Sequence, residues 1–94
     1  MDKKLQAVKD AQRLYTLLHV MNKTEDFQEH LARAEEVEKY IDKSYENYSA
    51  RDKLQAVKDV RRLYAMLKAR EQTAQVIECV DLVLALGDYI NEEI

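Results

Sequence analysis

A fifteen-residue segment occurs twice in this chain, and the two copies lie 49 residues apart. KLQAVKDAQRLYTLL begins at Lys4 and KLQAVKDVRRLYAML begins at Lys53, with eleven of the fifteen positions identical. The same shift, without a gap, aligns Thr24 with Thr73. Such a repeat indicates that one structural unit is used twice. We therefore expect a single domain over residues 1–94, composed of repeat units 1–49 and 50–94.

Each repeat unit has the pattern of a helical hairpin. Apolar residues in the first segment recur at spacings of three and four, which is typical of an amphipathic helix; they are Leu5, Val8, Ala11, Leu14, Tyr15, Leu18 and Met21. Asn22 is expected to close this helix in the left-handed conformation, and Thr24 and Thr73 to cap the helices that follow. Ser49, with Asp52 three residues later, resembles a capping box and predicts the start of the third helix. With short connections, the fold class is all-α, an up-down-up-down four-helix bundle.

Composition supports this fold class and excludes several functions. The chain has one glycine and no proline, whereas β sandwiches and barrels of this size need many turn residues. A net charge of −3 offers no basic surface for nucleic acid or anionic lipid, so we expect neither as a partner. The longest apolar run, Leu82 to Leu86, is too short to span a membrane. The lone Cys79 and the lack of a targeting signal favour a cytoplasmic location.

The charges are sorted by segment. Segments 2–21 and 51–70 are basic, whereas segments 25–48 and 74–94 are acidic. This alternation suits neighbouring antiparallel helices better than an external charged ligand.

Two unfavourable residues occupy matching places in the second helix of each unit. The first of these helices has the core pattern Phe27, Leu31, Ala34, Glu38, Ile41, Tyr45 and Tyr48; the second has Val76, Val80, Val83, Gly87, Ile90 and Ile94. Glu38 and Gly87 are repeat partners, and both a buried carboxylate and a mid-helix glycine are costly. The first and third helices supply small residues at the neighbouring level: Ala7, Val8, Ala11, Ala56, Val57 and Val60. We expect a pocket here.

The first functional hypothesis is a general-base catalyst of the Kemp-elimination type. Apolar surroundings raise the pKa of a carboxyl group and strengthen it as a proton acceptor, so Glu38 is the candidate base. The candidate residues around a small-molecule substrate are His30 and Tyr15 or Tyr64 for orientation, and Ala11, Ala34, Val60, Cys79, Val83 and Gly87 as lining. No cofactor is expected. The alternative is that Glu38 pairs with Arg61, Lys4 or Lys53, and that Gly87 only permits close packing.

A second group of chemically capable residues lies nearer the turns. His30 and Cys79 are repeat partners, as are His19 and Lys68. His30 with Cys79 could form a base and nucleophile, or His19, His30 and Cys79 a metal site. Neither spacing is a zinc motif, and a hydrogen-bonded core histidine beside an inert buried cysteine is the favoured interpretation. Lys68 is expected to extend to solvent.

The remaining hypothesis is a non-catalytic helical scaffold or protein-interaction module. The fourth helix is apolar over a wide arc because Ile77, Leu82 and Leu84 add to its core pattern. This arc either completes the wall of a monomeric bundle or exposes a dimerisation surface.

In length, turn position and apolar spacing, each unit resembles the Rab-binding helical hairpin of rabenosyn and the designed zinc-mediated dimers made from it. The matching residues are Val8, Ala11, Leu14, Asn22-Lys23, Glu25-Asp26-Phe27, Ala34, Val37 and Ile41. The positions that correspond to the zinc-binding histidines of the designed dimers are Glu35, Lys39, Arg61 and Ala65, so zinc chemistry does not carry over. The resemblance implies an engineered or redesigned bundle acting as an artificial enzyme or as a scaffold.

Overall fold

The computed structural model describes residues 2–42 and 49–92, which form four α-helices. Helix α1 spans Lys3–Met21, α2 spans Gln28–Asp42, α3 spans Ala50–Lys68 and α4 spans Ala74–Glu92. No strand occurs among the described residues, so the all-α class and the four-helix bundle are confirmed. Tyr45, Tyr48 and Ile94, which we assigned to the core pattern, lie outside the described residues.

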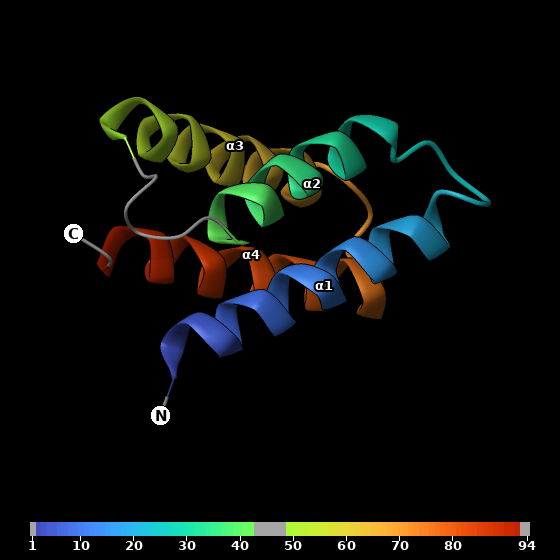
Figure 1. Ribbon diagram of the computed structural model, residues 1–94. Coiled ribbons are helices and arrows are strands. Elements are labelled where there is room, and N and C mark those ends of the chain that lie inside the picture. The colour runs from blue at the N-terminus through green and yellow to red at the C-terminus, as the bar shows by residue number, and fades with distance from the viewer. Residues whose placement is uncertain (1, 43–48, 93–94) are drawn as a thin grey trace.

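The helices form a ring in which each one packs against two neighbours. Helix α1 contacts α2 and α4, and α3 contacts the same two helices, whereas no Cα atom of α2 lies within 8 Å of one in α4. The α1–α2 and α3–α4 connections lie at one end of the bundle, and the two chain ends lie at the other (Figure 1). Every acidic helix therefore has basic neighbours, as the charge sorting indicates.

Local hydrogen bonds explain where the helices begin and end, and they correct two expectations. The Ser49 hydroxyl accepts a bond from the backbone N–H of Asp52 (3.1 Å), and the Thr73 hydroxyl accepts one from Val76 (3.2 Å), so both caps form as expected. Thr24 does not cap α2; its hydroxyl donates to the carbonyl of Met21 (3.3 Å), and α2 begins later, at Gln28.

Asn22 is the second correction. Its backbone is right-handed, with φ −64° and ψ −16°. In this conformation its side chain bridges the turn, since its Oδ1 accepts a hydrogen bond from the N–H of Phe27 (2.8 Å). The late start of α2 also shifts the two units. Glu38 is the eleventh residue of α2, whereas its repeat partner Gly87 is the fourteenth of α4. The two repeat partners are therefore at different distances, in residues, from the starts of their helices.

The core is a single apolar cluster to which all four helices contribute. Most of the expected core positions are buried, among them Leu14, Leu18, Phe27, Ile41, Val83 and Ile90. Leu5 is an exception at 52% exposed, since it lies one turn from the helix start on the solvent side. No helix in the described part of the chain is long and apolar enough to cross a membrane.

Ion pairs support two of the four helix interfaces. Arg13 of α1 binds Glu78 of α4 (2.9 Å), and Arg33 of α2 binds Asp59 of α3 (3.0 Å). Asp59 is 5% exposed and also accepts a bond from the Gln55 amide (3.1 Å), so its charge is compensated inside the bundle.

Candidate functional site

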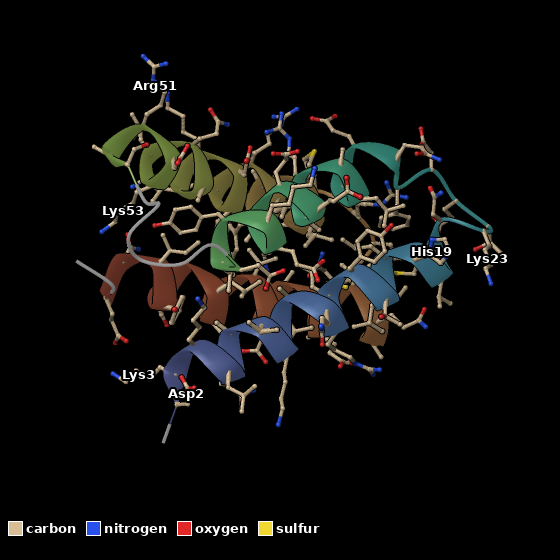
Figure 2. The ribbon with its side chains drawn as sticks, in the orientation of Figure 1. Asp2, Lys3, His19, Lys23, Arg51 and Lys53 are labelled. Atoms are coloured by element: carbon tan, nitrogen blue, oxygen red, sulfur yellow. The ribbon has the colours of Figure 1, made fainter. Side chains whose placement is uncertain are left out.

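Glu38, the candidate base, is partly buried on α2 and has no hydrogen-bond or ion-pair partner within the described part of the chain. None of the three expected cations pairs with it, and Figure 2 shows Lys53 near the end of the bundle away from the turns. Partial burial raises the pKa of the Glu38 carboxyl, and the nearby charges of Asp42 and Glu35 raise it further. Glu38 is therefore a weaker acid than an ordinary glutamate.

Gly87 lies in an open groove between α3 and α4, and this groove is apolar over most of its surface. An ideal Cβ at Gly87 would stand 3.2 Å from Cγ1 of Val60, so the missing side chain lets the two helices approach and leaves a hollow beside them. The groove has a volume of about 310 Å³ and is lined by Val60, Arg61, Tyr64, Val83, Leu84, Gly87, Asp88 and Asn91. Four expected substrate-lining residues, Val60, Tyr64, Val83 and Gly87, therefore meet at one place.

The structure does not bring Glu38 to that groove. Helices α2 and α4 are diagonal in the bundle, and the residues that line the groove all belong to α3 and α4. The repeat aligns Glu38 with Gly87 in sequence, but equivalent helices of a ring of four lie opposite one another. The expected pocket containing both residues is therefore absent from the described part of the molecule.

Tyr64 corrects a further expectation. Its repeat alignment with Tyr15 predicts a core-facing position, yet it is 37% exposed and lines the α3–α4 groove. Its repeat partner Tyr15 is partly buried, packs on the core and stacks on His19, with ring centroids 6.1 Å apart. Ala11 and Ala34 are buried in the core and line none of the hollows described here.

His30 is buried, 6% exposed, and neither ring nitrogen has a hydrogen-bond partner. The hydrogen-bonded core histidine that we favoured is thus wrong in one respect: the burial is correct, but the bonds are missing. The ring packs against Phe27, with centroids 4.9 Å apart, and the guanidinium of Arg70 covers Phe27 at 3.7 Å from its centroid. Burial lowers the pKa of His30 and the positive charge of Arg70 lowers it further, so both favour the neutral imidazole.

Cys79 is fully buried, and burial raises the pKa of its thiol to about 11. This agrees with the inert cysteine we expected. No hydrogen bond joins Cys79 to His30, so the proposed base–nucleophile pair is not formed. His19 is exposed near the turns (Figure 2), and within the described residues no three potential ligands are grouped to hold a metal ion.

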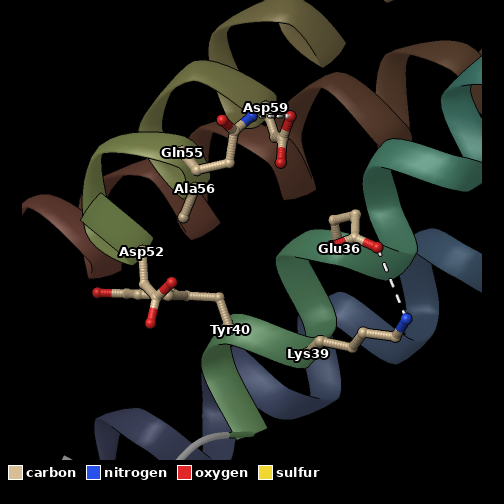
Figure 3. A pocket seen from close by; sticks show the side chains of 7 residues that line it. All are labelled: Glu36, Lys39, Tyr40, Asp52, Gln55, Ala56 and Asp59. Carbon is tan, nitrogen blue, oxygen red and sulfur yellow. Dashed lines mark hydrogen bonds and ion pairs between the residues drawn. The ribbon is translucent and has the colours of Figure 1, made fainter. Parts of the chain in front are cut away.

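A polar hollow that the sequence did not lead us to expect lies between α2 and α3 (Figure 3). Its lining includes three carboxylates, those of Glu36, Asp52 and Asp59, together with Tyr40 and Lys39. Lys39 forms ion pairs with Glu36 (3.6 Å) and with the adjacent Glu35 (3.8 Å). The burial of Asp59 could not be predicted from the repeat. Its repeat partner Asp10 accepts a similar hydrogen bond from Gln6 (3.0 Å) and is not buried.

In comparisons with known proteins, no protein family, curated protein or solved structure matches this chain. Functional inference therefore rests on the residues of the α3–α4 groove and of the polar α2–α3 hollow, together with Glu38.

Proposed function

We propose that this protein is a helical interaction module that binds an apolar group of a partner in the α3–α4 groove. One observation carries the proposal: Tyr64 and Leu84 are 37% and 49% exposed on either side of the hollow left by Gly87. Burying a large aliphatic or aromatic side chain there would gain about 25 cal/mol for each Å² of apolar surface removed from water.

The surrounding residues fit a binding role better than a catalytic one. The polar side chains that line the groove, Arg61, Asp88 and Asn91, are exposed to solvent and would orient a bound group. Asp88 supplies the one carboxylate among the lining residues and is exposed, whereas Val60 and Val83 are buried. The exposed Ile77, two helical turns from Leu84, extends the same face of α4.

Fluorescence of 1-anilinonaphthalene-8-sulfonate, which brightens in apolar sites, tests the proposal. Leu84→Gln removes a wall of the groove, whereas Leu54→Gln changes an equally exposed leucine (55%) elsewhere on α3. We expect the wild type and Leu54→Gln to bind the dye and Leu84→Gln to lose most of the signal. Equal binding by all three proteins, at equal stability, would show that the groove is not the site.

General-base catalysis by Glu38 is the second candidate function. The observation in its favour is the unpaired, partly buried carboxylate whose pKa is raised by burial, Asp42 and Glu35. Such a carboxyl group retains its proton at pH values where an ordinary glutamate is already ionised. Once ionised, its carboxylate is a stronger proton acceptor than that of an ordinary glutamate.

A Kemp elimination with 5-nitrobenzisoxazole tests this candidate. The rate should rise with pH through an inflection above the ordinary glutamate range, and Glu38→Gln should abolish the increase. Glu35→Gln, three residues away on the same helix, is the matched control and should lower the inflection slightly, since it removes one repelling charge. A Glu38→Gln variant with the wild-type profile would remove Glu38 from the mechanism.

A further inference from the structure

The α3–α4 face carries four charged side chains without a partner in the described part of the chain. Arg61 and Lys68 lie seven residues apart on α3, and Asp81 and Asp88 lie seven residues apart on α4; all four are exposed. No ion pair joins α3 to α4 among the described residues, whereas the α1–α4 and α2–α3 interfaces are each joined by at least one. The face therefore has a basic half and an acidic half on either side of the apolar groove.

The two pairs of charges lie at matching heights. Arg61 and Asp88 line the same groove beside the contact between Val60 and Gly87. Because the helices are antiparallel, Lys68 and Asp81 both lie two turns closer to the α3–α4 connection. Each basic side chain of α3 thus has an acidic counterpart on α4 at the same level.

A surface of this kind is complementary to itself. A two-fold axis parallel to the helices would place α3 of one molecule over α4 of another at the same height, with Arg61 opposite Asp88 twice and Lys68 opposite Asp81 twice. The same operation would place Leu84 of each molecule over Tyr64 of the other. A two-fold axis across the helices would instead stack basic α3 on basic α3, which like-charge repulsion disfavours.

We propose that the occupant of the groove is a second copy of this chain, docked through α3 and α4 about a two-fold axis parallel to the bundle. This inference rests on the proposed interaction function and specifies its partner. Two nineteen-residue helices side by side present a face on the order of 600 Å², somewhat below the roughly 800 Å² per partner of a standard interface. The dimer is therefore weak and depends on protein concentration.

Sedimentation equilibrium with charge-reversed variants tests the geometry. In Arg61→Asp, two aspartates face each other on both sides of the two-fold axis, and in Asp88→Arg two arginines do so. Each variant alone should dissociate at least tenfold more readily than the wild type. An equimolar mixture of the two should recover a heterodimer, because every facing pair is then of opposite charge. Lys9→Asp, an exposed lysine on α1 with the same charge change, is the matched control and should sediment as the wild type does.

The outcomes separate this inference from the function on which it rests. A wild-type protein that stays monomeric up to millimolar concentration, or a mixture that does not associate better than its components, would overturn the dimer. If the dye still binds at Leu84 in that case, the apolar groove stands as an interaction site and its occupant is another molecule. If the protein neither dimerises nor binds the dye in a way that depends on Leu84, the interaction function itself is overturned.

Discussion

Replacing His30 with leucine should stabilise the protein, although the histidine is part of the core. The two buried ring nitrogens lack partners, and an unsatisfied buried polar group costs about 1–3 kcal/mol. The substitution also removes the ring contact with Phe27, and such aromatic pairs contribute about 0.5–1.5 kcal/mol. The free energy of unfolding of His30→Leu at pH 7.5 should thus exceed that of the wild type by about 1 kcal/mol.

The gain should grow as the pH falls. In the folded state the pKa of His30 lies below its ordinary value of 6.5, because burial and the positive charges of Arg70 and Arg62 outweigh the opposing charges of Glu29 and Asp26. The unfolded chain therefore binds the proton first, and the wild type loses stability as the pH falls below about 6.5, by at most about 1.4 kcal/mol per pH unit. His30→Leu lacks this loss.

Urea denaturation at pH 7.5, 6.5 and 5.5 measures both effects. The difference in unfolding free energy between His30→Leu and the wild type should be positive at pH 7.5 and larger at pH 5.5. His19→Gln changes an exposed histidine and is the matched control, for which we expect the wild-type pH dependence. A His30→Leu variant that is less stable than the wild type at every pH would refute the reasoning, since it would mean that the imidazole is satisfied in solution.

Three other perturbations follow from the structure. Gly87→Ala should stabilise α4 by about 0.5 kcal/mol, because most of the 0.5–1 kcal/mol helix penalty of glycine is recovered while Cγ1 of Val60 shifts slightly; thermal melting that shows a loss above 1 kcal/mol would contradict this. Asp59→Asn should cost about 2 kcal/mol in urea, and its repeat partner change Asp10→Asn less than 0.5 kcal/mol; equal losses would deny the buried ion pair its role. Cys79 should react with a disulfide reagent at pH 8 only as fast as the bundle opens, and rapid reaction of the folded protein would contradict its burial.

The sequence was sufficient for the architecture because the repeat, the apolar spacing and the caps act locally. Ser49 and Thr73 bond to the backbone three residues later wherever the rest of the chain lies, so their pattern identifies a helix start. Thr24 is the repeat partner of Thr73 and still fails as a cap. The side chain of Asn22 bonds across the first turn, and no equivalent residue exists in the second, where Glu71 stands at that position.

The candidate site depends on which helices are neighbours, and a repeat says little about that. Sequence alignment places Glu38 beside Gly87, but the ring arrangement sets α2 and α4 diagonally, so the two residues belong to different surfaces. Of the residues expected to line a pocket with Gly87, Val60 of α3 and Val83 of α4 do so, whereas Cys79 of α4 is fully buried and does not line the groove. Burial of Asp59 was missed for a related reason: Arg33, which compensates its charge, comes from a helix whose contacts the repeat does not specify.

The central claim is that the hollow beside Gly87 is where this protein takes up an apolar group. A titration of ¹⁵N-labelled protein with indole, followed by amide chemical shifts at a concentration where the chain is monomeric, tests it most directly. We predict that the largest shifts fall on Val60, Tyr64 and Gly87, with little change around Glu38. Shifts centred on Glu38, or none that saturate, would contradict the claim.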